Sequence, residues 1–181
     1  METEDEFIGR LANPSTRRDA FGQLVTRYGD QLYWKIRRLV LSHEDANDVL
    51  QNTFIKAWTR IDTFQNKSKI STWLYRIAIN EALDFIRKKK NVTTVGTDDS
   101  VAQKLMADKN FDGDRAQAIL QEAIAKLPEV QRTVFNLHYF EDMKYSEISE
   151  ILHTSEGALK ASYHFATVKI TEYVKAHEDE L

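Results

Sequence analysis

Apolar residues recur at intervals of three and four positions along almost the whole chain, and this spacing constrains the possible folds more than any other feature. Such a period places apolar side chains on one face of an α-helix. Only 6 Gly and 2 Pro occur among 181 residues, so few positions break a helix. The sequence therefore predicts an all-α fold.

The helical period fades between residues 91 and 114, where Thr, Asp, Lys and Asn replace the apolar residues. Gly96 and Gly113 lie near the two ends of this stretch. Polar segments flanked by glycine are typical of linkers. We therefore predict two small helical domains, residues 1–90 and 115–181, joined by a flexible linker over residues 91–114.

Three helices are expected in the first domain. One covers residues 17–41, and the next begins at Ser42 or Asp45, either of which can cap it. The third begins at Ser71, after a polar loop over residues 62–69. The inward-facing residues predicted for the second and third helices are Val49, Leu50, Phe54, Ala57, Trp58, Trp73, Leu74 and Ile77.

The second domain contains the pattern of a helix-turn-helix. Leu152 ends one apolar helix face, His153 and Thr154 fit a tight turn, and Ser155 can cap the next helix. That next helix would offer its outer face to the major groove of a DNA duplex. Few cations lie there, so we expect weak duplex binding by this module alone. The outer-face residues are Ser155, Glu156, Lys160, Ala161, His164 and Thr167.

Basic residues are concentrated in one stretch of the chain. Residues 54–90 carry nine basic and three acidic side chains, a net charge of +6, whereas residues 1–53 sum to −2 and residues 91–181 to −7. A basic block in an acidic chain predicts a surface for a polyanion. Aromatic rings stack on unpaired bases, so the rings of this block favour single-stranded nucleic acid. They are Trp58, Phe64, Trp73, Tyr75 and Phe85.

Several classes of protein are excluded by composition. The absence of cysteine rules out disulfides, a thiolate nucleophile and a thiolate zinc site. No apolar run reaches the roughly 18 residues that a membrane span needs, and the acidic start lacks the order of a secretory signal. We therefore expect a cytoplasmic protein without membrane insertion, and we expect neither a cofactor nor a metal.

Three segments in a fixed order carry a family resemblance. Residues 45–58 read Asp-Ala-Asn-Asp-Val-Leu-Gln-Asn-Thr-Phe-Ile-Lys-Ala-Trp, and residues 71–80 read Ser-Thr-Trp-Leu-Tyr-Arg-Ile-Ala-Ile-Asn. Residues 127–132 read Leu-Pro-Glu-Val-Gln-Arg and precede the helix-turn-helix. Together they resemble bacterial RNA polymerase sigma factors of the extracytoplasmic-function (ECF) type. The resemblance covers residues 17–90 and 115–172, and it implies a promoter-directing factor that performs no catalysis of its own.

The resemblance implies that the helix after Ser42 binds core RNA polymerase. In the family this helix docks on a coiled coil of the largest subunits, and a carboxylate and an amide beside an apolar ring suit such a partner. Without the resemblance, the acidic residues near the helix start would be interpreted as a solvated first turn. The polymerase-binding residues so implied are Asp45, Asp48, Gln51, Asn52 and Phe54.

The loop and helix after Trp58 resemble the part that captures the melted −10 promoter element. A base that leaves the stack regains about 1–3 kcal/mol by stacking on an aromatic ring. The resemblance places Phe64 at such a pocket, with Lys56 nearby and with Asn80 offering a donor and an acceptor to a base edge. The residues expected to hold phosphates are Lys67, Lys69, Arg76, Arg87 and Lys88.

The helix-turn-helix resembles the domain that reads the −35 element. Members of the family commonly carry Gly where this chain has His153, and arginines where it has Ala161, Phe165 and Thr167. The resemblance therefore does not predict which bases this chain prefers at the −35 element. The family also implies promoter DNA and an anti-sigma factor as partners. The −35 residues implied are Ser155, Lys160, Ala161, His164 and Thr167.

Two other functions are compatible with the residues taken alone. A helix-turn-helix regulator would bind DNA without replacing the specificity subunit of the polymerase, and its N-terminal helices would dimerise or sense a signal. A metal-dependent enzyme would use His43, Asp45 and Asp48. Dependence on core polymerase distinguishes a sigma factor from the regulator, and a bound divalent ion would indicate the enzyme.

Overall fold

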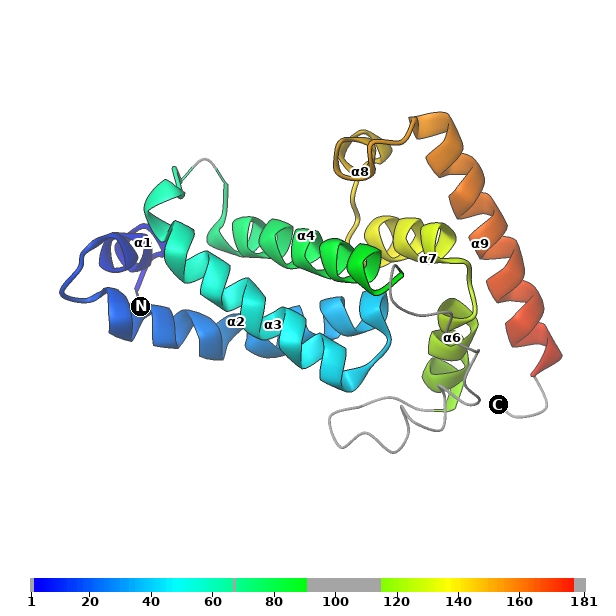
Figure 1. The fold of residues 1–181 in the computed structure, drawn as a ribbon, viewed down its shortest axis with the longest axis horizontal. Coiled ribbons are helices and arrows are strands. Elements are labelled where there is room, and N and C mark those ends of the chain that lie inside the picture. Colours follow the sequence, from blue (N-terminus) through cyan, green and yellow to red (C-terminus); the bar gives the residue numbers. More distant parts are fainter. Residues whose placement is uncertain (1, 67, 91–114, 178–181) are drawn as a thin grey trace. The chain divides into compact units, whose positions relative to one another are not determined.

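The computed structural model describes residues 2–66, 68–90 and 115–177, and the chain divides into two compact units, Met1–Thr93 and Thr94–Leu181 (Figure 1). Every regular element among the described residues is a helix, which confirms the all-α prediction. The predicted linker over residues 91–114 lies outside the described residues. Its boundaries therefore remain a prediction.

Three long helices form the first unit: α2 (Arg17–Val40), α3 (His43–Arg60) and α4 (Ile70–Lys90). Each packs against the other two, so they enclose one apolar core (Figure 1). A short 3-10 helix, η1 (Ile61–Thr63), follows α3. The buried residues recur at the predicted spacing of three and four and include Ala20, Leu24, Leu32, Ile36, Val49, Ala57, Leu74 and Ile77.

Ser42 caps α3, as predicted. Its Oγ accepts a hydrogen bond from the Asp45 backbone N–H at 3.4 Å. Leu41, just before it, ends α2 in the left-handed region with a φ of 66°. Asp45 therefore lies inside the first turn of α3, where a carboxylate is favoured by the helix dipole.

Trp58 does not face inward, and that prediction is wrong. Its side chain is 43% exposed, whereas Ala57 beside it is fully buried. Successive residues of a helix are turned by about 100°, so Trp58 lies past the edge of the buried face. Its ring meets the edge of Phe21, with centroids 5.0 Å apart. Apolar spacing alone does not identify a residue at the border of a helix face.

An additional helix, α1 (Glu4–Ala12), precedes α2 and is not predicted by the apolar period, because Phe7 and Leu11 are its two buried residues. A capping box starts it: Thr3 Oγ1 accepts from the Glu6 N–H at 3.2 Å, and Glu6 Oε2 accepts from the Thr3 N–H at 2.8 Å. The hydrogen bonds from Thr3 lower the pKa of Glu6 below its usual range. Because folding lowers this pKa, the cap is retained at neutral pH and weakens as the pH falls through the pKa of Glu6.

The second unit is organised around α9 (Glu156–Ala176), which packs against three other helices. One cluster of buried residues in this unit consists of Ala123, Ile124, Leu127, Phe135, Ala166 and Ile170. The other helices of the unit are α6 (Arg115–Ala125), α7 (Glu129–Phe135), which continues into the π-helical turn η2 (Asn136–Phe140), and α8 (Tyr145–Leu152).

The helices α8 and α9 form the predicted helix-turn-helix. His153 ends α8 in the left-handed region, with φ 52° and ψ 42°. Ser155 then caps α9, since its Oγ accepts from the Ala158 N–H at 3.3 Å. Leu159 is fully buried on the inner face of α9. The tight turn and the cap thus fix the direction of α9 relative to α8.

We expect His153→Gly to stabilise the second unit by about 1 kcal/mol, because glycine adopts the left-handed conformation without the Cβ clash that other residues suffer. His153→Val should instead destabilise the second unit. Hydrogen exchange of the α8 and α9 amides is a suitable measurement, since all three tryptophans of the chain (Trp34, Trp58 and Trp73) lie in the first unit. Lower protection in His153→Gly would contradict the assignment of strain to this turn.

Candidate nucleic-acid interface

One face of α3 is exposed and mostly polar. Asp48 lies on it, Gln51 and Asn52 follow about one turn later, and all three are exposed. Ile55 continues the same face one turn later and is 55% exposed. These four residues are called the α3 stripe. The family resemblance implies a binding surface for the three polar residues but not for Ile55, which stands out in the sequence as an apolar residue outside the buried period.

Two further residues predicted to bind polymerase are engaged inside the unit. Phe54 is half-buried, and its ring meets that of Phe21 edge-on at 6.4 Å between centroids. Asp45 forms an ion pair with Lys89 of α4, with 2.5 Å between Oδ2 and Nζ. Both residues therefore attach α3 to its neighbours, and neither is exposed to the extent of the α3 stripe.

The candidate metal ligand His43 is bound through both ring nitrogens. Its Nε2 lies 3.0 Å from the amide Nδ2 of Asn47, and its Nδ1 lies 2.7 Å from the hydroxyl of Tyr33. Over the described part of the chain, no group of three His, Asp or Glu side chains is arranged to hold a metal ion. These contacts give His43 a structural role at the start of α3.

Phe64 lies at the end of η1, where the polar loop begins, and it is half-buried. Its ring packs against Trp73 of α4, with centroids 5.4 Å apart and planes inclined by 55°. Phe64 is therefore partly buried against the core of the unit and retains some exposed surface. Trp73 is half-buried too, whereas Leu74 and Ile77 are buried as predicted.

Asn80 shares a side of α4 with Trp73. It follows Trp73 by seven residues, which is about two turns or 10 Å along a helix, and it is exposed. Arg76 and Arg87 lie on nearly the same side, and we call Arg76, Asn80 and Arg87 the α4 line. Lys69 and Lys88 are exposed near the two ends of α4, and Lys67 lies outside the described residues.

Lys56 forms an ion pair with Glu81, and this contact joins α3 to α4 directly beside Asn80. The Lys56 side chain is 41% exposed, while that of Glu81 is 12% exposed. The family resemblance implies that Lys56 lies near the Phe64 pocket, and that placement stays a prediction; the contact that the structure shows for Lys56 is the one with Glu81. Its charge is largely balanced, because Glu81 is the more buried partner and stays in contact with it.

The predicted outer-face residues of α9 are exposed, and they include Lys160, Ala161, His164 and Thr167. Ser155 is exposed as well, while its hydroxyl serves as the helix cap. Two apolar side chains that sequence reasoning did not assign to this face are also exposed, Phe165 at 55% and Val168 at 40%. The exposed surface of α9 therefore combines three lysines, Lys160, Lys169 and Lys175, with the apolar Phe165 and Val168.

Comparison with known proteins decides the family. The family model of sigma-70 region 2 matches residues 24–92, and that of sigma-70 region 4 matches residues 117–170. The ECF RNA polymerase sigma factor SigW of Bacillus subtilis is 36% identical over 157 residues, covering 81% of this chain and 84% of SigW. The chain is an RNA polymerase sigma factor of the sigma-70 family, ECF type.

Solved structures agree with this sigma-factor assignment. The structure of CnrH, in complex with the cytosolic domain of CnrY, is similar with a TM-score of 0.61 and 26% identity over 94% of this chain and 96% of CnrH. The sigma factor RpoE of Bartonella quintana, in complex with the anti-sigma factor NepR, shares the fold with a TM-score of 0.66 and 23% identity over 86% of this chain and 96% of RpoE.

The function of the sigma factor is therefore to direct RNA polymerase to promoters. A helix-turn-helix regulator that leaves the polymerase unchanged is not favoured, because sigma-70 region 2 matches the first unit as well. Among the helices of the described residues, none has both the length and the hydropathy needed to cross a membrane.

If Glu81 balances Lys56, then Glu81→Gln should strengthen binding of the polymerase–sigma complex to single-stranded DNA. One more available cation should make the slope of log K against log salt steeper by about 0.7, the value for one phosphate contact on a single strand. The measurement is a salt titration of DNA affinity. Glu44→Gln, which changes the same charge at an exposed site at the other end of α3, is the control. Equal effects of the two variants would contradict a local role for the pair.

Proposed function

We propose that the first unit binds core polymerase through the α3 stripe and captures the melted −10 strand with Phe64, Lys69 and the α4 line. This proposal depends on the observation that α3 and α4 pack on one another within a single core. The α3 stripe and the α4 line, which are both exposed, are therefore carried by the same rigid unit. Polar groups beside an exposed Ile55 suit a protein partner. Cations and a partly buried aromatic ring suit a single strand.

We further propose that the second unit reads the −35 duplex with α9. Lys160 contacts phosphate or base, and Ala161, His164 and Thr167 face the groove; Ser155 orients the helix start. One lysine among these residues releases few counterions, so the affinity of this unit for duplex DNA should be low by itself. The polymerase would supply the remaining affinity by holding both units on one promoter.

The partners proposed for the intact sigma factor are core RNA polymerase, promoter DNA and an anti-sigma factor. The anti-sigma proposal is supported by the similar structures, since RpoE was solved with NepR and CnrH with the cytosolic domain of CnrY. We also propose that the factor acts in the cytoplasm and performs no catalysis, because the polymerase carries out the chemistry of transcription.

Run-off transcription with the purified chain, core polymerase and genomic fragments tests this function and also reveals the promoter. Transcripts that start at a defined site with the chain, and not with core polymerase alone, are the expected result. Tight and sequence-specific binding of the chain alone to duplex promoters, without any effect on core polymerase, would instead favour a conventional regulator.

Within this function, Asp48→Ala should weaken assembly with core polymerase by about tenfold, because a charged hydrogen-bonding group contributes about 1.5–3 kcal/mol when its partner is present. The affinity is measured with labelled core polymerase. Asp30→Ala removes an exposed carboxylate from α2 and is the matched control, expected to leave assembly unchanged. Loss of affinity in both variants would show a general charge effect and argue against the α3 stripe.

Phe64→Ala should separate strand capture from polymerase binding. Loss of one stacked base costs about 1–3 kcal/mol, so open-complex formation should fall by about tenfold or more, while assembly with core polymerase stays unchanged. Permanganate reactivity of unpaired thymines measures strand opening. Phe64→Tyr keeps the ring and should retain most of the activity. Normal opening with Phe64→Ala would remove Phe64 from the proposed site.

A further inference from the structure

The segment before α2 contacts the loop that carries Phe64, although it precedes the family match, which begins at residue 24. Phe7 and Leu11 of α1 belong to the same apolar core as Leu74 of α4. This packing holds α1 beside η1 and the start of α4. Glu4 and Asp5 of this segment, together with Arg17, the first residue of α2, then reach the loop.

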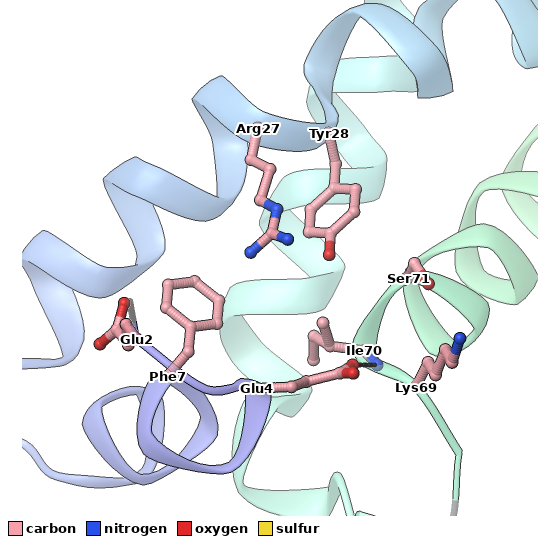
Figure 2. Close-up of a pocket in the computed structure, with 8 residues that line it drawn as sticks. All are labelled: Glu2, Glu4, Phe7, Arg27, Tyr28, Lys69, Ile70 and Ser71. Atoms are coloured by element: carbon pink, nitrogen blue, oxygen red, sulfur yellow. Dashed lines mark hydrogen bonds between the residues drawn. The ribbon is translucent and has the colours of Figure 1, made fainter.

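Glu4 and Asp5 contact the C-terminal side of the loop. Figure 2 shows Glu4 extending from α1 to α4, where its Oε1 accepts from the Ile70 backbone N–H at 3.1 Å. This N–H is one of those that a helix start leaves without a partner in its own backbone. Asp5 Oδ1 accepts from Asn66 Nδ2 at 3.3 Å. Asn66 has a φ of 53°, a conformation that needs support in a residue other than glycine.

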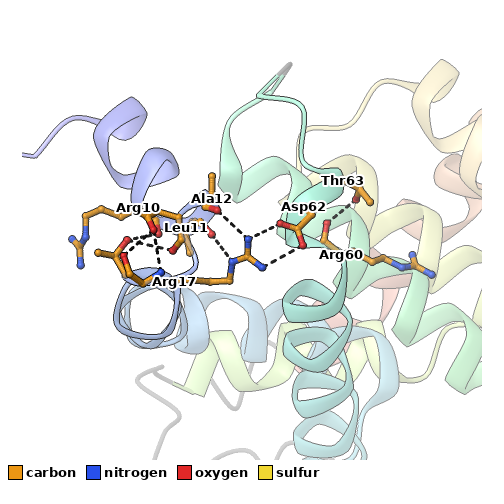
Figure 3. A network of polar contacts seen from close by, with 10 residues as sticks. Arg10, Leu11, Ala12, Arg17, Arg60, Asp62 and Thr63 are labelled. Carbon is orange, nitrogen blue, oxygen red and sulfur yellow. Dashed lines mark hydrogen bonds and ion pairs between the residues drawn. The ribbon is translucent and has the colours of Figure 1, made fainter.

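Arg17 holds the other side of the loop, as Figure 3 shows. Its guanidinium donates to both carboxylate oxygens of Asp62 in η1, at 2.6 and 3.2 Å. The same group donates to the carbonyls of Leu11 and Ala12 at the end of α1, at 2.9 and 3.0 Å. A planar guanidinium can make these contacts at once, whereas an ammonium cannot form the same fork. Arg17 thereby joins α1, α2 and η1.

We propose that residues 4–17 are part of the strand-capture site and that Glu4 and Arg17 are its positioning residues. They hold the two ends of the loop so that Phe64 keeps its place against Trp73. The ligand is the one proposed above, the melted promoter strand, and the inference therefore rests on that function. It adds to the site a segment that precedes the residues matched by the family model of sigma-70 region 2.

Removal of the Glu4 carboxylate can either weaken or strengthen DNA binding, and the direction of this change distinguishes a positioning role from electrostatic repulsion of the DNA. Glu4 and Asp5 lie beside a surface proposed to bind a polyanion, so a purely electrostatic role would make their removal strengthen DNA binding. A positioning role predicts the opposite for Glu4→Ala. Glu4→Gln decides between them, because its amide oxygen can still accept from the Ile70 N–H after the charge is gone.

The test uses the full chain assembled with core polymerase and a fluorescent single-stranded oligonucleotide that carries the −10 sequence of a promoter found by run-off transcription. Glu4→Ala should weaken oligonucleotide binding by about five- to tenfold, since a displaced ring loses much of the stacking of one base. Glu4→Gln should bind within about twofold of the unchanged protein. Glu2→Ala is the matched control, because Glu2 lies nearby and pairs with Arg10 at 2.9 Å.

Arg17→Ala and Arg17→Lys provide an independent arm, and both should weaken strand binding while assembly with core polymerase stays unchanged. Stronger binding by Glu4→Ala and Glu4→Gln alike would overturn the proposal in favour of repulsion. Unchanged binding by Glu4→Ala and Arg17→Ala, with Phe64→Ala defective, would overturn it and leave the proposed function intact. Unchanged binding by Phe64→Ala would overturn both. Circular dichroism of each variant verifies that α1 is retained.

Discussion

Close packing of α3 on α4 is the constraint on which both surfaces of the first unit depend. Small side chains are buried on both helices, with Ala46, Ala57, Ala78 and Ala82 at most 1% exposed. Small residues allow two helices to approach closely and leave little freedom to slide. Ion pairs between the helices, Lys56 with Glu81 and Asp45 with Lys89, add polar contacts to this packing. A polymerase that binds α3 therefore also fixes the direction in which α4 presents its cations.

Every carboxylate of the basic stretch is paired with a cationic side chain. Residues 54–90 carry a net charge of +6; within them Glu81 pairs with Lys56 and Asp84 with Arg87, whereas Asp62 pairs with Arg17 and Lys89 with Asp45, both outside the stretch. Exposed pairs of this kind are worth about 0–1 kcal/mol each, so they add little stability. Their main effect is to orient cations and to moderate the field that acts on distant DNA. This favours capture of a strand already presented by the polymerase over binding to any passing duplex.

Local sequence signals predicted the helices and their caps well. The apolar period gave α2, α3, α4 and α9, and short-range chemistry gave the Ser42 and Ser155 caps. The helix α1 could have been found from the Thr3–Glu6 capping box, although its two buried residues give no clear period. The ion pairs could not have been predicted, because the partners of Lys56 and Asp45 lie 25 and 44 residues away along the chain. The prediction for Trp58 was wrong because this residue lies at the border of the buried face of α3, where apolar spacing alone does not decide exposure.

The candidate site was predictable where it depends on the helix period and not where it depends on tertiary contacts. Exposure of Asp48, Gln51 and Asn52 follows from their position opposite a buried helix face, and that relation is contained in the sequence period. The half-burial of Phe64 against Trp73 is a tertiary contact that spacing does not encode. The roles of these residues toward polymerase and DNA still rest on the family resemblance and on the proposals above.

The composition of α9 determines how the two units must cooperate. Residues 91–181 carry a net charge of −7, and the exposed face of α9 offers Lys160 beside the apolar Phe165 and Val168. Counterion release, which supplies most non-specific affinity for DNA, grows with the number of phosphates neutralised, and here that number is small. Affinity must then come from tethering, because a second contact made within one complex benefits from a high effective concentration. If the two units act as proposed, a weak −35 reader is sufficient once α3 is attached to polymerase and the melted strand is held by the first unit.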